Sequence, residues 1–161
     1  NVIAGKGLVG IVTDVGPNYA KVRSIIDDSS NVSAMVLTTK DNFNVSGSLM
    51  SMNQNKVLPF SELRDEKNKL KQGDPVVTSY VSDKYLQGIL IGYIYDVEDN
   101  ANNLTKSGSI TPVVDFQHLQ EVLVITTVKD TGSFSSGTED TEESTQADTQ
   151  NTQDTQTQSN E

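Results

Sequence analysis

The chain has 161 residues, a net charge of −10 and no cysteine. The lack of cysteine excludes disulfides, thiol catalysis and cysteine-based zinc sites. Residues 1–128 carry 14 acidic and 11 basic side chains, so this part has a net charge of −3 and no basic excess of the kind that binds nucleic acid. The longest strongly apolar run, Gly88 to Tyr95, is far shorter than the roughly 20 residues of a membrane helix. No signal peptide is visible and the chain begins at Asn1, so we expect a trimmed piece of a longer protein.

β-Branched residues dominate the apolar content, since Val and Ile number 27 against 11 Leu. This bias favours strands over helices. Strands are predicted, in chain order, at Val9–Val15, Ala20–Ile26, Val32–Thr39, Gly47–Met52, Pro75–Tyr80, Ile89–Val97, Ile110–Val114 and Val122–Val128. Turn signals such as Gly16-Pro17-Asn18 and Gly73-Asp74-Pro75 separate these runs. We therefore predict an all-β fold of short strands that form a sandwich or barrel.

Only one stretch, Ser61–Lys71, has a helix-like pattern, and its charge suggests a solvated linker between two lobes. The sequence then divides into a first lobe at residues 1–58 and a second lobe at residues 59–128. Each lobe is small enough to be marginal alone, so we expect the two to pack together. We predict two small antiparallel barrels.

Residues 129–161 differ sharply in composition from the rest of the chain. Their only apolar side chains are Phe134 and Ala147, and eight acidic residues stand against Lys129. Such a segment buries too little apolar surface to offset the entropy of ordering its backbone. We predict a disordered acidic tail that acts as a solvated spacer, with an acidic docking segment as the alternative.

Two apparent ligand motifs fail on their context. Gly5, Gly7 and Gly10 spell the glycine pattern of a dinucleotide site, but the residues that follow have strand rather than helix composition. The run that begins at Asp96 resembles a calcium loop, yet Ala101 stands where that loop needs glycine. We expect no cofactor, no metal and no small-molecule substrate.

His118 is the only histidine, so a serine hydrolase of the Ser-His-Asp type would have to use it. Asp115 is the nearest acid that could orient the imidazole. No serine lies in a nucleophile motif such as G-x-S-x-G. We therefore interpret His118 as a solvated turn residue and predict that the chain is not an enzyme.

Four of the five tyrosines, Tyr80, Tyr85, Tyr93 and Tyr95, lie within 16 residues. Tyrosine suits protein interfaces because it can bury its ring while its hydroxyl stays wet. Alternation places Tyr93 and Tyr95 on one face of their strand, which could instead be core. Tyr80 and Tyr85 flank an expected loop, so they are the stronger partner-binding candidates.

Three blocks of sequence, in this order, resemble one family. They are Gly7-Leu8-Val9-Gly10 leading into Val12, Val15 and Val22; Lys71-Gln72-Gly73-Asp74-Pro75-Val76-Val77-Thr78-Ser79 followed by Gly88-Ile89-Leu90-Ile91-Gly92; and Pro112-Val113-Val114-Asp115 through Leu119 to Val124-Ile125. Over roughly residues 7–126 the chain resembles the extracytoplasmic β-domain of the rod-shape-determining MreC family. It departs from the family pattern at Tyr80, where glycine is usual, and at Gln87, where proline is frequent.

The resemblance implies two packed β-barrels with the shape of trypsin-like proteases but without their catalytic residues. It also implies a scaffold of the cell-wall elongation complex at the extracytoplasmic face of the bacterial membrane. Such a scaffold binds penicillin-binding proteins, an MreD-like membrane partner and itself, and its full-length form carries a membrane anchor. The motif residues that we expect to be structural are Gly7, Gly10, Gly73, Asp74, Thr78, Ser79, Gly88, Gly92 and Pro112. The alternative function is a degenerate or active trypsin-like hydrolase that uses His118.

Overall fold

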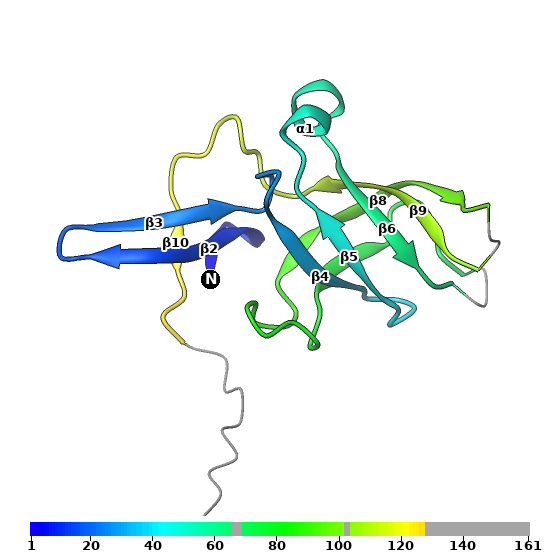
Figure 1. Ribbon diagram of the computed structural model, residues 1–161, viewed down its shortest axis with the longest axis horizontal. Coiled ribbons are helices and arrows are strands. Elements are labelled where there is room, and N and C mark those ends of the chain that lie inside the picture. The colour runs from blue at the N-terminus through cyan, green and yellow to red at the C-terminus, as the bar shows by residue number, and fades with distance from the viewer. Residues whose placement is uncertain (66–68, 102–103, 128–161) are drawn as a thin grey trace, which may run out of the picture. The chain divides into compact units, whose positions relative to one another are not determined.

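The structure, a computed structural model, describes residues 1–65, 69–101 and 104–127 (Figure 1). Within these ranges the elements are β1 (Val2–Ala4), β2 (Gly7–Gly16), β3 (Tyr19–Ser24), β4 (Asn31–Val36), β5 (Asn42–Ser46), α1 (Leu49–Asn55), β6 (Leu58–Leu63), β7 (Pro75–Thr78), β8 (Leu90–Asp99), β9 (Lys106–Pro112) and β10 (Leu123–Val124). The predicted all-β class is confirmed. The predicted acidic tail, residues 129–161, lies outside the described residues. In the described ranges, no helix has the length and apolar content to cross a membrane.

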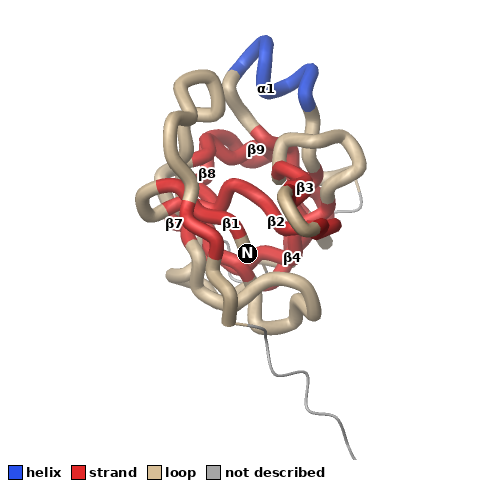
Figure 2. Tube along the Cα trace, turned by 90° about the vertical axis from the view of Figure 1, so that its left-hand side faces the viewer, coloured by secondary structure: helices blue, strands red, loops and turns tan. Residues whose placement is uncertain are grey.

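Six strands close into an antiparallel barrel in the order β4-β5-β6-β9-β8-β7, with β7 pairing back to β4. Figure 2 shows β4, β7, β8 and β9 around a ring. The barrel joins strands from both sides of the predicted lobe boundary at residue 58, because β4 and β5 pair with β7 and β6.

Strand alternation fills the barrel. In β4, Val32, Ala34 and Val36 are buried while the residues between them are partly exposed. Phe43 and Phe60 pack edge to face with their ring centroids 5.1 Å apart, an arrangement that aromatic pairs favour. Burial of this apolar interior is the main contribution to stability.

The remaining strands form an outer sheet in the order β10-β1-β2-β3, joined to the barrel where Gly7 of β2 pairs with Leu90 of β8. This sheet has its own small core of Val2, Val9 and Val114, against which Val12 packs. Its long β2–β3 hairpin projects away from the barrel (Figure 1).

Two local predictions are wrong. Gly47–Met52 is not a strand, because Ser48 caps a helix there: its hydroxyl accepts the N–H of Ser51 at 3.2 Å. The helix-like pattern of Ser61–Lys71 gives no helix in the described residues 61–65 and 69–71, because residues 61–63 belong to β6, which pairs with β5 and β9. Tertiary pairing outweighs the weak helical pattern there.

The final predicted strand is also much shorter than expected. In the described residues, β10 holds Leu123 and Val124 alone, which pair with β1, and both side chains are exposed. Val128 lies outside the described residues.

Candidate protein-binding groove

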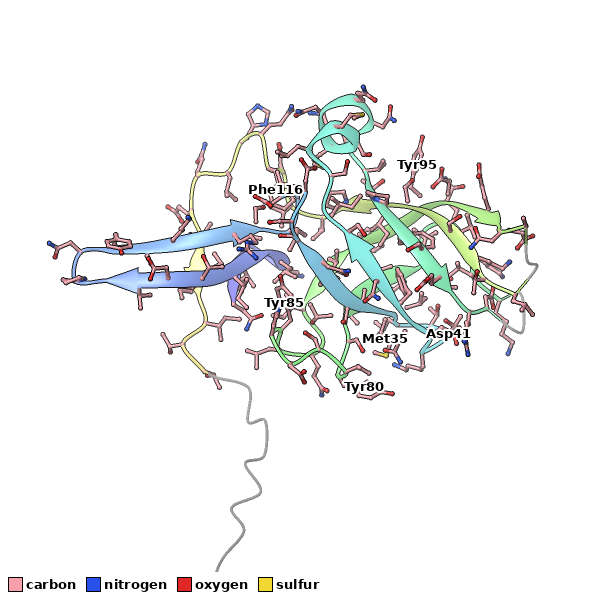
Figure 3. The ribbon with its side chains drawn as sticks, in the orientation of Figure 1. Met35, Asp41, Tyr80, Tyr85, Tyr95 and Phe116 are labelled. Carbon is pink, nitrogen blue, oxygen red and sulfur yellow. The ribbon has the colours of Figure 1, made fainter. Side chains whose placement is uncertain are left out.

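An apolar groove of about 450 Å³ opens on the barrel wall between β4, β7 and the loop that joins β7 to β8. Its lining consists of Met35, Leu37, Lys40, Val77, Tyr80, Gln87 and Gly88. Figure 3 shows Met35 and Tyr80 on the same side of the barrel. Leu37 and Tyr80 are exposed, so the groove presents apolar side chains to solvent.

Thr78 and Ser79 hold the loop that forms one wall of this groove, and both are fully buried. The Thr78 hydroxyl donates to the carbonyl of Leu86 at 2.6 Å and accepts the N–H of Ile89 at 2.9 Å. The Ser79 N–H donates to the carbonyl of Ser33 at 2.9 Å. The two motif residues therefore fix both ends of the loop to the barrel.

Two glycines that the sequence singles out lie in turns. Gly88 has a φ of +83° and Gly73 a φ of +88°, a backbone region that favours glycine. Asp74 supports the second turn, because its carboxylate accepts the N–H of Lys71 at 2.8 Å. These turns set the direction in which the chain enters β7 and β8.

The other motif residues lie where strands approach closely. A Cβ atom on Gly92 would lie 2.1 Å from the carbonyl oxygen of Thr111, and one on Gly10 would lie 2.1 Å from that of Arg23. Gly7 is crowded by side chains in the same way, and Pro112 pairs with Gly92 across β8 and β9. All four serve packing between strands rather than the groove.

The four tyrosines have different surroundings. Tyr80 is 58% exposed and lines the groove, whereas Tyr85 is 4% exposed and belongs to the barrel core. Burial raises the pKa of the Tyr85 hydroxyl, and the positive charge of Arg23 partly opposes this. Tyr85 is therefore a core residue, and its choice as a surface candidate is wrong.

Tyr93 and Tyr95 lie on the outer face of β8, at 42% and 52% exposure. The predicted alternation put them on one face with Ile91, which is fully buried. A bulge explains the difference, since the β8 register shifts against β7 between Leu90 and Gly92. The extra residue reverses which side chains point inward beyond it, and a second shift, against β9 between Ile94 and Asp96, lies past Tyr93.

His118 and Asp115 form an exposed pair in the turn after β9. The imidazole Nδ1 lies 2.7 Å from a carboxylate oxygen of Asp115, and this contact is the main cause that lowers the pKa of that carboxyl. The backbone N–H of Gln117 donates to the same side chain at 3.0 Å. The hydrolase alternative would need a serine hydroxyl within hydrogen-bonding reach of this imidazole, whereas the imidazole contacts Asp115 and is largely in solvent.

Sequence reasoning missed Met35, Leu37 and Lys40 as groove residues. They lie far from Tyr80 in the sequence, and pairing of β4 with β7 brings them beside it. Both positions that depart from the family pattern, Tyr80 and Gln87, line the groove.

Comparison with known proteins gives consistent results. The family described as rod shape-determining protein MreC, barrel core, matches residues 1–126. The cell shape-determining protein MreC of Listeria monocytogenes is 32% identical over 134 residues, which are 82% of this chain and 44% of that protein. This chain therefore spans less than half the length of that relative.

Solved structures agree on the fold. An MreC structure from Listeria monocytogenes has a TM-score of 0.66 and 31% identity, covering 75% of this chain and 57% of that one. A complex between penicillin-binding protein PBP2 and MreC from Helicobacter pylori contains a chain with a TM-score of 0.58 and 12% identity, covering 75% of this chain and 73% of that one. The barrel, the family match and the Listeria relative together show that this chain belongs to the MreC family of rod shape-determining proteins.

Proposed function

We propose that this chain is a non-catalytic scaffold of the bacterial cell-wall elongation machinery, and that it binds a penicillin-binding protein through the groove beside Tyr80. The observation that carries this proposal is the apolar groove itself, whose loop wall is fixed to the barrel by buried hydrogen bonds. The solved complex of an MreC with PBP2 supports the choice of partner class.

The lining of the groove indicates what the partner presents. Met35, Leu37 and Val77 offer an apolar floor, and Tyr80 offers an aromatic wall. Lys40 is exposed at the same groove and adds one positive charge. We expect an apolar anchor side chain on the partner, with an acidic residue beside it, since a buried anchor usually supplies most of the affinity of such an interface.

The wider setting is part of the same proposal. The scaffold acts at the extracytoplasmic face of the membrane, its full-length form carries a membrane anchor, and it also contacts an MreD-like partner and further copies of itself. A solved relative described as the major periplasmic domain of MreC supports this location. The two-barrel arrangement also stays a prediction, for which the separate core of Val2, Val9 and Val114 is the support.

The proposal is tested by Tyr80→Ala, with Tyr95→Ala as the matched control because both rings are similarly exposed. Binding to a purified PBP2-type protein from the same bacterium is measured by biolayer interferometry on the full chain. Loss of a hot-spot tyrosine weakens binding by about 2 kcal/mol, roughly thirtyfold. Tyr95→Ala leaves the affinity unchanged, and both variants keep the wild-type urea midpoint. Equal affinities for the wild type and Tyr80→Ala would remove the groove from the interface.

The non-catalytic part of the proposal is tested separately with a serine-directed fluorophosphonate probe. A scaffold is not labelled, whereas a hydrolase that uses His118 is labelled, and His118→Ala abolishes that labelling. Labelling that depends on His118 would establish the enzyme alternative.

A further inference from the structure

β3 is an edge strand, because no other described strand pairs with its side away from β2. A two-residue turn, Pro17-Asn18, joins the two strands, and within the described ranges β3 pairs with β2 alone. The hairpin also projects from the rest of the molecule (Figure 1). An exposed edge of this kind is a template for a further strand.

The hydrogen bonds between β2 and the β3 segment show which residues of β3 face that edge. The N–H of Ile25 donates to the carbonyl of Val9 at 2.9 Å, and the hydroxyl of Thr13 donates to the carbonyl of Lys21 at 3.3 Å. Residues 21, 23 and 25 therefore direct their backbone groups toward β2. Since direction alternates along a strand, the N–H and C=O groups of Ala20 and Val22 point outward.

The two faces of the hairpin differ in chemistry. On one face Val12 lies opposite Val22, and Val15 lies opposite Ala20. Val15 is 69% exposed and Val22 is 40% exposed, whereas Val12 packs on the core of the outer sheet. An apolar stripe thus extends from that core out along the hairpin.

The opposite face carries charge. Lys21 lies opposite Asp14, whose carboxylate also accepts the Tyr19 hydroxyl at 3.0 Å, and Arg23 lies opposite Ile11. β3, the strand at the free edge, therefore presents two positive side chains, although the net charge of the whole chain is −10. A strand added beside β3 would place its own side chains next to these cations.

The charges of Lys21 and Arg23 indicate which kind of strand can pair with β3. If two copies of β3 paired antiparallel about Val22, Lys21 of each copy would lie opposite Arg23 of the other, and like charges opposite each other are destabilising. An added strand with acidic residues on this face and apolar residues on the other would match both faces. We propose that the β3 edge is a second binding site, which takes an extended acidic–apolar segment of another protein as an added strand.

The probe is a short synthetic peptide in which glutamates alternate with valines, and its control has lysine in place of each glutamate. Binding to the full chain is measured by fluorescence anisotropy at low salt. We expect the glutamate peptide to bind roughly tenfold more tightly than the lysine peptide. Equal binding of the two peptides, or no binding of the glutamate peptide, would overturn the proposal.

Three variants separate strand addition from simple charge attraction. Val22→Pro removes an outward N–H, a change that an edge strand tolerates, and lowers the affinity for the glutamate peptide roughly tenfold. Val22→Thr keeps this N–H and binds the glutamate peptide with the wild-type affinity. Lys21→Glu with Arg23→Glu reverses the preference to the lysine peptide. Far-UV circular dichroism confirms that each variant is folded. Wild-type affinity of Val22→Pro for the glutamate peptide would overturn strand addition. If the wild-type chain forms a dimer and Val22→Pro is monomeric, the added strand comes from a second copy of this chain and the proposed partner is wrong.

Discussion

Replacing Thr78 by valine tests what holds the loop of the groove. Valine has nearly the same shape, so no cavity forms, but the carbonyl of Leu86 and the N–H of Ile89 lose their shared hydroxyl partner. Each loss at a fully buried site costs about 1–2 kcal/mol, so we expect Thr78→Val to lower the free energy of unfolding by about 2–4 kcal/mol. In a domain of this size that corresponds to a fall in Tm of roughly 6–16 °C.

The measurement is urea unfolding followed by circular dichroism, with the slope of the transition checked for constancy. Thr78→Ser keeps the hydroxyl and loses only a methyl group, at a cost of about 1 kcal/mol. Thr111→Val makes the same chemical change at an exposed position of β9 and shifts the stability by at most about 0.5 kcal/mol. If Thr78→Val were as stable as Thr111→Val, the hydroxyl bridge would not be what fixes the loop.

Three further results are expected. Tyr85→Ala, which empties a core site, costs about 3–5 kcal/mol in urea unfolding, whereas a cost like that of Tyr80→Ala would place Tyr85 at the surface. Deleting residues 133–161 leaves Tm unchanged because those residues supply almost no apolar side chains, and a fall of several degrees would show that the segment docks on the fold. The Asp115 carboxyl titrates below the ordinary value of 3.8, so any stability it contributes is lost as the pH falls through its lowered pKa. His118→Ala raises the midpoint of the Asp115 titration followed by NMR. An unchanged midpoint would show that the contact with His118 is not what lowers this pKa.

Features fixed by local chemistry could be predicted from the sequence. Gly73-Asp74-Pro75 forms the turn that its composition indicates, since Gly73 takes a positive φ and the Asp74 side chain accepts a backbone N–H. The excess of Val and Ile likewise gave the correct fold class. Both signals act within a few residues, so they do not depend on how the chain closes into a barrel.

Features fixed by distant pairing could not be predicted in the same way. The alternation in β8 looks regular, yet its register is set by β7 and β9, which impose bulges near Ile91 and Tyr95. The groove depends on distant pairing too, because Leu37 and Tyr80 meet only once β4 has paired with β7. No periodicity within one segment carries that information.

The contrast between Tyr80 and Tyr85 shows how small the deciding difference is. Both lie in the same loop, and the buried hydroxyl of Ser82 lies between them. That hydroxyl accepts the N–H groups of Lys84 and Tyr85, at 3.2 Å and 3.0 Å, and so turns the chain back toward the barrel. Tyr85 follows this turn into the core, while Tyr80 stays outside the turn and lines the groove. The turn that this serine hydroxyl supports thus separates an exposed ring at the groove from a buried ring in the core.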